Sequence, residues 1–357
     1  MSIYVSILCS ILLFSVLIFV HELGHFMTAK AFKVRVNEFS MFMGPAIFKK
    51  QVGETLYAIR CIPVGGYCAM EGEDGDSDDP RSFQKASWWK RLIILVAGAA
   101  MNFLIGLVFF AIVFGFEQTL DKPLIQSFTE TSTLSTETGL QVGDEILKID
   151  GEKLYVCNDF TTVLFYKGGD VHDILVLRDG EKVLLDDVPV HTYTVTAEDG
   201  TEYQQYGITF TQYAPGLLDR VRYVWNFAID NVRYVRFGLQ MILTGKAGLK
   251  DMTGMVGIVD LVSEATAATE NVGQAWLTIL YFGGFIAVNL AVMNLLPIPA
   301  LDGGRAVGLL LTTTIEAITR KKINPKYEGY IHGIGLILLL ILMAVITFKD
   351  IFFIIKR

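Results

Sequence analysis

An apolar run without a charged residue extends from residue 3 to residue 20 and leads directly into the sequence His-Glu-Leu-Gly-His at 21–25. A run of this length favours a membrane-spanning helix, because lipid offers no hydrogen-bond partner to free backbone groups. Residues four apart lie on one face of a helix, one turn from each other. His21 and His25 are therefore predicted to lie together on a membrane helix, with Glu22 between them in the chain.

Two histidines in this arrangement can bind one zinc ion, and a glutamate between them can act on a water that the zinc activates. The same motif also occurs by chance on soluble helices, as part of a polar face. On an apolar helix that interpretation would bury three polar groups without purpose, whereas ionisable groups at membrane depth mark function by default. We therefore expect hydrolytic zinc chemistry in or against a bilayer, with His21 and His25 as zinc ligands and Glu22 as the catalytic base.

The composition supports a membrane protein. Of 357 residues, 52% are hydrophobic and 19% charged, and the mean hydropathy of +0.45 is too high for a typical soluble protein. The net charge of −7 comes without a basic stripe, so membrane lipid is an expected partner and nucleic acid is not. The four cysteines contain no Cys-x-x-Cys pair and indicate neither a disulfide framework nor a cysteine zinc site.

Four apolar segments approach or exceed the ~20 residues that a transmembrane helix needs, at about 3–26, 92–116, 275–296 and 331–355. The first lacks the basic start and the cleavage site of a signal peptide, so we expect it to be retained. Basic residues concentrate between the first and second segments and between the third and fourth. The positive-inside rule places both of these loops in the cytosol, and the long segment 117–274 outside.

The parts between the spans have their own patterns. Residues 34–70 alternate apolar and polar positions around Gly44-Pro45 and Gly65-Gly66, which predicts a membrane-associated β-loop. The acidic stretch 71–79 lacks the flanking helices of a calcium-binding loop, and we expect a solvated linker there.

The external segment divides in two. Residues 117–213 contain short apolar runs separated by Asp-Gly turns, which predicts one β-rich domain. Residues 219–243 have helical apolar spacing with several arginines, which indicates an amphipathic helix on the bilayer or on the folded domain, or an ordinary connecting helix. The expected organisation is a membrane core in two parts, 1–116 and 275–357, with the β-rich domain at 117–213 and a connecting region at 214–274.

A catalytic zinc site needs a third protein ligand. His172 and His191 lie in the external segment, across the membrane from the motif, and His332 is a lone helix residue for which a structural hydrogen bond is the expected role. Asp302 is the best third ligand, because it follows the third span on the same side of the membrane. Pro297 precedes it in a broken stretch of backbone, and such backbone at membrane depth is tolerated only where it is buried or lines a cavity.

With these motifs the chain resembles the site-2 protease family of intramembrane zinc metalloproteases, in its bacterial regulator-of-sigma-E protease branch. Residues 21–25 and 294–303 are similar to its two signature motifs, in order and orientation. Residues 63–67 resemble its membrane-embedded β-loop, 135–151 resemble a PDZ domain, and 252–258 resemble a further family segment. The fold class expected is thus a polytopic α-helical membrane protein of four transmembrane helices, with the β-loop and an inserted PDZ domain.

The resemblance implies a bacterial cytoplasmic-membrane protease with its zinc site toward the cytoplasm and its PDZ domain outside. Asn294 would orient the substrate or stabilise the transition state. The implied substrates are single-pass transmembrane proteins, such as an anti-sigma factor already trimmed outside, or remnant signal peptides. Such a helical substrate must unwind locally, and it would add as a strand to the edge of the β-loop.

Two features depart from the family pattern. The better-known proteobacterial members carry two PDZ domains, whereas segment 117–213 has room for one, which puts a double substrate filter in doubt. The early glycine pair of the β-loop is reduced to Gly44, with Phe42 at the first position. Strand-edge recognition at this loop is therefore expected to differ from that of the family.

Two other classes of protein use similar features. A transporter also has broken helices and charged groups at the membrane midplane, although the four spans show no internal repeat. A membrane-anchored PDZ scaffold is the second alternative, and it would not need the histidines, Glu22 or Asp302.

Overall fold

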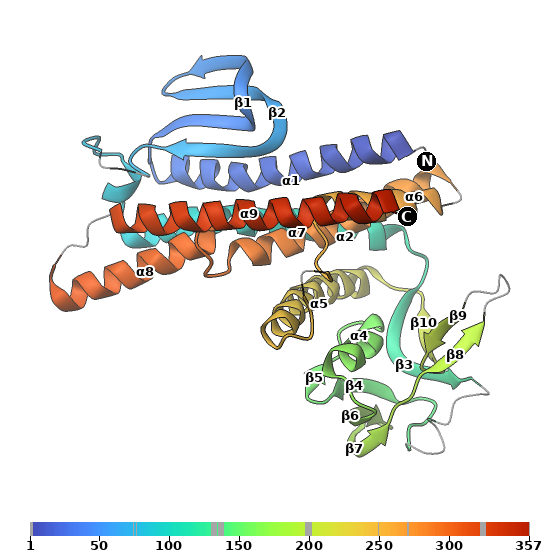
Figure 1. The fold of residues 1–357 in the computed structure, drawn as a ribbon. Coiled ribbons are helices and arrows are strands. Elements are labelled where there is room, and N and C mark those ends of the chain that lie inside the picture. The colour runs from blue at the N-terminus through green and yellow to red at the C-terminus, as the bar shows by residue number, and fades with distance from the viewer. Residues whose placement is uncertain are drawn as a thin grey trace. The chain divides into compact units, whose positions relative to one another are not determined.

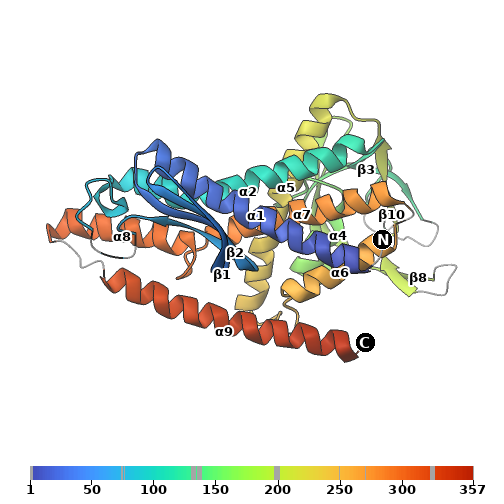
Figure 2. The ribbon, with the colours of Figure 1, turned by 90° about the horizontal axis from the view of Figure 1, so that it is seen from above.

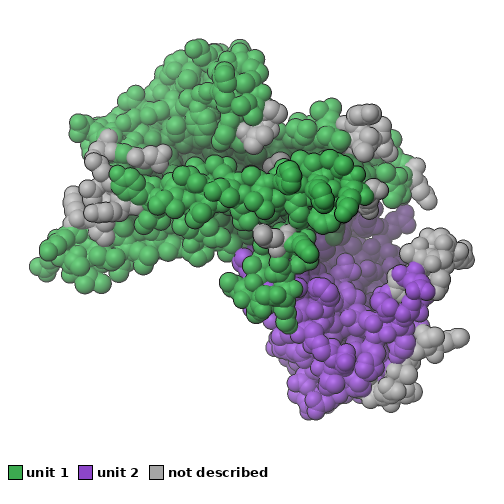
Figure 3. All heavy atoms as spheres, viewed as in Figure 1, with its two compact units in different colours: residues 1–112, 242–357 green, residues 113–241 purple. Residues whose placement is uncertain are grey.

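The computed structural model of the chain describes residues 3–73, 75, 77–129, 134, 139–196, 202–248, 250–269, 271–321 and 326–356. They form two compact units, coloured separately in Figure 3. The first unit comprises residues 1–112 and 242–357, and the second comprises residues 113–241. The metal-ligand candidates and the membrane segments, apart from residues 113–116 at the end of the second one, belong to the first unit, so the chain returns to it after the second.

Four helices in the described part of the chain are long and apolar enough to cross a membrane. They are α1 (Ile3–Ala31), α2 (Trp88–Phe116), α7 (Val272–Asn294) and α9 (Lys326–Lys356). Within the first unit their axes follow a common direction (Figures 1 and 2). The prediction of four spans is therefore confirmed, and the chain is a multi-pass membrane protein.

Small residues let these helices approach closely. A Cβ on Gly24 of α1 would lie 2.8 Å from the carbonyl carbon of Ala97 on α2. Likewise, a Cβ on Gly106 of α2 would lie 3.2 Å from the carbonyl oxygen of Gly284 on α7. Close backbone approach at glycine is a general means of packing helices in lipid, where the hydrophobic effect does not drive association.

The predicted β-element is present as two long antiparallel strands, β1 (Val36–Val52) and β2 (Thr55–Met70), which pack on α1 (Figure 1). Each strand bends, so that residues 36–41 lie between 66–70 and 56–59, and residues 46–52 pair with 55–60. The side chain of Phe39 is buried and contacts Phe26 of α1, with 4.9 Å between the ring centroids. The sheet is thereby fixed to the helix that carries the two histidines.

The acidic stretch 71–79 is a solvated linker only in part: Gly75 and Asp78 are exposed, as expected, whereas Glu71 and Glu73 are held by side-chain contacts. The Glu71 carboxylate accepts hydrogen bonds from Asn37 Nδ2 at 2.7 Å and from the Ser77 hydroxyl at 2.6 Å. Glu73 forms an ion pair with Arg305 of α8 (Asp302–Thr319). Two of these partners, Asn37 and Arg305, come from parts of the chain far from 71–79, so the contacts that hold the stretch are largely tertiary. Asp74 and Asp76 lie outside the described residues.

The strands of the second unit are β3 (Leu120–Phe128), β4 (Glu145–Ile149), β5 (Glu152–Lys153), β6 (Val171–Arg178), β7 (Glu181–Pro189), β8 (Tyr193–Thr196), β9 (Glu202–Gln205) and β10 (Ile208–Tyr213). They form a sheet with the strand order β10-β3-β4-β6-β7, in which β5 pairs with β4, while β8 and β9 pair separately. Helix α4 (Asn158–Lys167) packs on this sheet with Phe160 and Leu164 in its core.

The amphipathic helix α5 (Leu217–Leu243) packs on this β-rich domain through Phe237, which is 3% exposed. Arg233 of α5 is also buried, and it pairs with Asp230 and, at 2.6 Å, with Asp159 of α4. Burial, followed by the neighbouring Asp159 carboxyl group, raises the pKa of Asp230 to about 8. The buried Arg233 guanidinium contacts both carboxyl groups, which reduces the cost of burying this charge cluster.

Two further helices in the first unit have no counterpart among the predicted elements. These are α8 and α6 (Met255–Ala267), and the short helix η1 (Phe83–Lys85) precedes α2. Helix α6 contacts α1, α7 and α9. Its first turn lacks a side-chain cap of its own, and the Asp350 carboxylate of α9 accepts hydrogen bonds there from Gly254 N at 2.9 Å and Gly257 N at 3.1 Å.

Candidate metal centre

Helix α1 brings the two motif histidines together, as the spacing of four residues predicts. The Nε2 atoms of His21 and His25 lie 3.2 Å apart. His25 is buried. Both imidazole rings therefore present one nitrogen to the same point on the helix surface.

Asp302 reaches this point from the other end of the sequence. Helix α7 ends at Asn294, and α8 begins at Asp302 itself. The Oδ2 atom of Asp302 lies 3.1 Å from His21 Nε2 and 3.3 Å from His25 Nε2. The break in the chain that the prolines predict thus places a carboxylate against two imidazoles.

The spacing of these three atoms fits a zinc ion. With zinc–ligand bonds of ~2.0–2.1 Å and tetrahedral angles, the ligand atoms of a zinc site lie ~3.3 Å from one another. The observed separations are 3.1, 3.2 and 3.3 Å. In the described part of the chain this is the one group of three or more His, Cys, Asp or Glu side chains with such an arrangement. Three protein ligands leave a fourth position for water or substrate, as in catalytic zinc sites.

The outer nitrogens of both rings have polar neighbours. His25 Nδ1 lies 2.8 Å from the carbonyl oxygen of Ile94 on α2. Because a carbonyl only accepts, this nitrogen carries the proton, and the Nε2 lone pair of His25 is free for a metal.

His21 Nδ1 lies 3.3 Å from Asn102 Nδ2 and 3.4 Å from Asn294 Nδ2. The Oδ1 atom of Asn102 is buried and has no hydrogen-bond partner among the described residues. Turning this amide by half a rotation would place Oδ1 against His21 Nδ1–H and satisfy both groups. The donor set then matches two neutral imidazoles and one carboxylate.

Asn102 is a residue that the sequence reasoning missed. It interrupts an otherwise apolar stretch of α2, and this is the signal that could have identified it. The predicted Asn294 does lie beside the cluster, at the last residue of α7.

Glu22 lies between the cluster-forming histidines in the chain and beside the β-sheet. A Cβ on Gly66 of β2 would lie 3.4 Å from Glu22 Cγ and 3.1 Å from the carbonyl oxygen of Ser40. The sheet segment 66–70 therefore passes directly beside the glutamate.

Gly98 of α2 faces the two imidazole rings, which occupy the space that a side chain at this position would need. A Cβ at this position would overlap His25 Nε2 and would lie 2.7 Å from His21 Cε1. The Gly98→Ala variant is expected to bind zinc at least ~10-fold more weakly, because one or both rings must move. Zinc retained per chain after dialysis against a chelator measures this. Gly115→Ala, on the same helix with open space around its Cβ, is the matched control. Equal zinc retention in both variants would contradict the assignment of this cluster.

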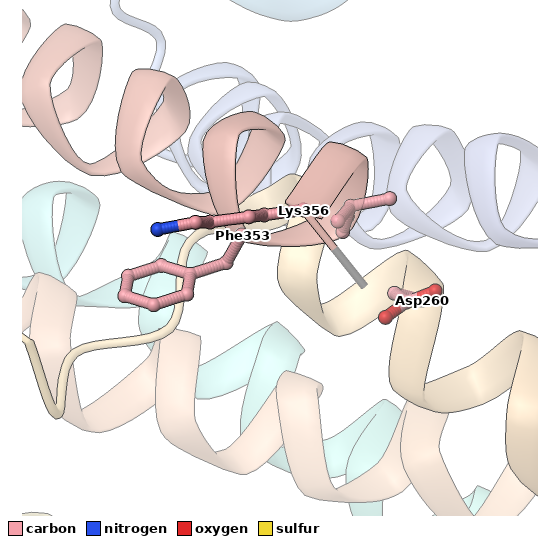
Figure 4. Close-up of a pocket in the computed structure, with 4 residues that line it drawn as sticks. Asp260, Phe353 and Lys356 are labelled. Atoms are coloured by element: carbon pink, nitrogen blue, oxygen red, sulfur yellow. The ribbon is translucent and has the colours of Figure 1, made fainter.

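A separate crevice lies beside the C-terminal end of α9 (Figure 4). Asp260 of α6 and Phe353, Ile354 and Lys356 of α9 line it. These side chains provide one carboxylate and one ammonium group, which is not a metal-binding set. The metal centre therefore remains the candidate catalytic site.

A group of candidate metal ligands from membrane helix α1 and from the start of α8, with a glutamate next to one of the histidines, is the arrangement expected of a membrane metallohydrolase. The sequence model of peptidase family M50 matches residues 9–342, and the chain belongs to this family, the site-2 proteases. The protein is thus a membrane zinc metalloprotease. Family membership favours the enzyme over the transporter and the scaffold.

Named relatives agree with this assignment. A protein of Clostridium perfringens that carries the name zinc metalloprotease is 36% identical over 352 residues, which cover 97% of this chain and 98% of the relative. A similarly named protein of Fusobacterium nucleatum is 32% identical, with 97% and 98% covered. The regulator of sigma-W protease RasP of Bacillus subtilis is 28% identical, again with 97% and 98% covered.

Proposed function

We propose that this metalloprotease cleaves single-pass membrane proteins within or at the edge of the bilayer, in regulated intramembrane proteolysis. The observation that carries the proposal is the close grouping of the His21, His25 and Asp302 ligand atoms within the unit that contains the membrane spans. Trimmed anti-sigma factors and remnant signal peptides are the substrates that we expect from the regulator-of-sigma-E protease branch. The name of the Bacillus subtilis relative, a regulator of a sigma factor, agrees with the first of these.

In this proposal His21, His25 and Asp302 hold the zinc ion. Bound there, zinc would supply a Lewis acid that polarises a carbonyl and makes water acidic enough to react near pH ~7. Glu22 takes a proton from the attacking water and passes it to the leaving amine. Asn294, 3.4 Å from His21, orients the substrate or its transition state.

A helical substrate hides its carbonyl groups in its own hydrogen bonds and must unwind before cleavage. Among the described strand pairs, residues 66–70 pair with 36–41 alone, so they form one end of the sheet. An unwound substrate segment that adds as a strand there would lie beside Glu22, because Gly66 approaches the glutamate side chain. Main-chain pairing of this kind gives affinity with little demand on side-chain sequence.

We further propose that the β-rich domain within 117–213 is a PDZ domain. An antiparallel sheet with β10 at one edge supports this, and Phe210 of β10 contacts Phe160 of α4 with 5.7 Å between ring centroids. Of the sequence stretch 135–151 that suggests the domain, residues 135–138 lie outside the described residues.

We propose an orientation with the metal centre toward the cytoplasm of a bacterium and the PDZ domain outside, on the charge bias of the loops. With Cys9, Cys61, Cys68 and Cys157 replaced, a cysteine at exposed Asp78 is expected to resist an impermeant thiol reagent in intact cells. One at exposed Lys182 is expected to react. The measurement is the labelled fraction before and after the membrane is permeabilised. The reverse pattern would invert the orientation.

The PDZ domain lies apart from the chemistry in this arrangement, and we propose that it is a filter against substrates with bulky outer domains. The full-length enzyme in detergent is then expected to cleave a trimmed single-pass substrate and to spare the untrimmed form. Deletion of 121–212 is expected to allow cleavage of both, and the ends can be rejoined because Leu120 and Tyr213 are paired neighbours on β3 and β10.

The alternative is that the domain recruits trimmed substrate through a free C-terminal carboxylate. A recruiter would be lost with the deletion, so the trimmed substrate would be cut more slowly and the untrimmed form still spared. That result would contradict the filter, provided that the deletion variant retains its zinc.

A further inference from the structure

The loop between α7 and α8, which positions Asp302 at the metal centre, has a tightly folded and strained backbone. Between α7 and α8 the Ile298 amide donates to the Leu296 carbonyl at 2.7 Å, and the Leu301 amide donates to the Ile298 carbonyl at 3.2 Å. Ala300, two residues before the candidate ligand, has φ of 78°. The left-handed conformation is unfavourable for a residue with a side chain, so neighbouring structure must hold it.

The first turn of α8 rests on this loop. Cβ atoms on Gly303 or Gly304 would overlap backbone carbonyl groups of Leu295 and Ile298, respectively. The N-cap residue Leu301 offers no side-chain hydrogen bond to the helix. The loop and the start of α8 are therefore packed tightly together, and a shift of the loop is expected to shift Asp302.

Helix α9 contacts the loop at two positions on one face. The Ala300 amide donates a hydrogen bond to His332 Nδ1 at 3.1 Å. One turn further on, α9 lies so close that a Cβ on Gly335 would overlap Pro299, with its carbonyl oxygen 3.0 Å away. Residues three apart share a helix face, so both contacts come from the same side of α9.

We infer that His332 is a positioning residue of the metal centre. Its Nδ1 accepts the amide of strained Ala300, Gly335 brings α9 onto Pro299, and together they fix the loop that sets Asp302 Oδ2 within 3.1–3.3 Å of the two histidines. His332 acts through the backbone and is not itself a ligand. This inference rests on the proposed assignment of Asp302 as a ligand.

The test is the affinity of full-length protein in detergent for zinc, measured by competition with a chromophoric chelator. His332→Ala is expected to weaken binding ~10-fold, in the range typical of residues that orient metal ligands. His332→Asn, whose Oδ1 can accept the same amide, is expected to stay within ~3-fold of the parent. Ile334→Ala, on an exposed side chain of the same helix, is the matched control and is expected to leave affinity unchanged.

Further variants separate positioning from other roles. In an Asp302→Ala background, His332→Ala is expected to cause no additional loss of zinc affinity, because it acts through that carboxylate. An additional loss there, an equal loss in His332→Asn and His332→Ala, or unchanged affinity in His332→Ala alone would each overturn the inference. Unchanged affinity in Asp302→Ala would instead overturn the proposed metal centre, so the two failures are distinguishable.

Discussion

Replacement of Glu22 by glutamine is expected to lower kcat for peptide cleavage by ~10²–10⁴-fold while one zinc ion per chain remains bound. Glutamine keeps the shape of the side chain beside Gly66 but cannot take a proton from water. Because Glu22 is not one of the three grouped candidate ligands, metal binding is expected to survive. Cleavage of a trimmed single-pass substrate by purified protein measures the effect.

Glu54→Gln is a suitable control, because Glu54 belongs to the same unit and forms partly exposed ion pairs with Lys30 and Arg81. Such pairs contribute little, so activity is expected within ~2-fold of the parent. Near-normal cleavage by Glu22→Gln would show that another group moves the proton. Loss of zinc in this variant would make Glu22 a ligand, and the proposed division of roles would fail.

The local patterns of the sequence were sufficient for the membrane helices and for the pair of histidines. Long apolar runs predict spans because lipid leaves backbone groups no alternative to a helix, and His21 and His25 meet because their spacing is one helical turn. Asp302 could be proposed from its depth and from the broken chain around Pro297. Its approach to the histidines within 3.1–3.3 Å could be seen only in the structure.

Features that depend on contacts between distant segments could not be predicted from the sequence. In the sequence Gly98 is one of several small residues of α2, and nothing local indicates that the two imidazoles occupy the space where its side chain would be. The local pattern of the acidic stretch 71–79 predicts a solvated linker, because it cannot reveal the contact of Glu73 with Arg305, which lies 232 residues away. The bend that places residues 36–41 between two segments of β2 is likewise a tertiary arrangement.

The double variant His25→Ala, Asp302→Ala is expected to lose essentially all bound zinc and all proteolysis. Two of three ligand atoms would be gone, and one imidazole cannot hold zinc against a chelator. His172→Ala is the control for removing a histidine, since its ring is engaged elsewhere, 2.7 Å from Asp150 Oδ2 in the β-rich domain. This control is expected to retain zinc.

The most direct measurement is the zinc content per chain of the purified full-length protein and of these variants, by elemental analysis with a known protein concentration. One zinc per chain in the parent and in His172→Ala, with none in the double variant, is the result expected from a centre made by His21, His25 and Asp302. Full zinc occupancy in the double variant would contradict that centre and the mechanism built on it.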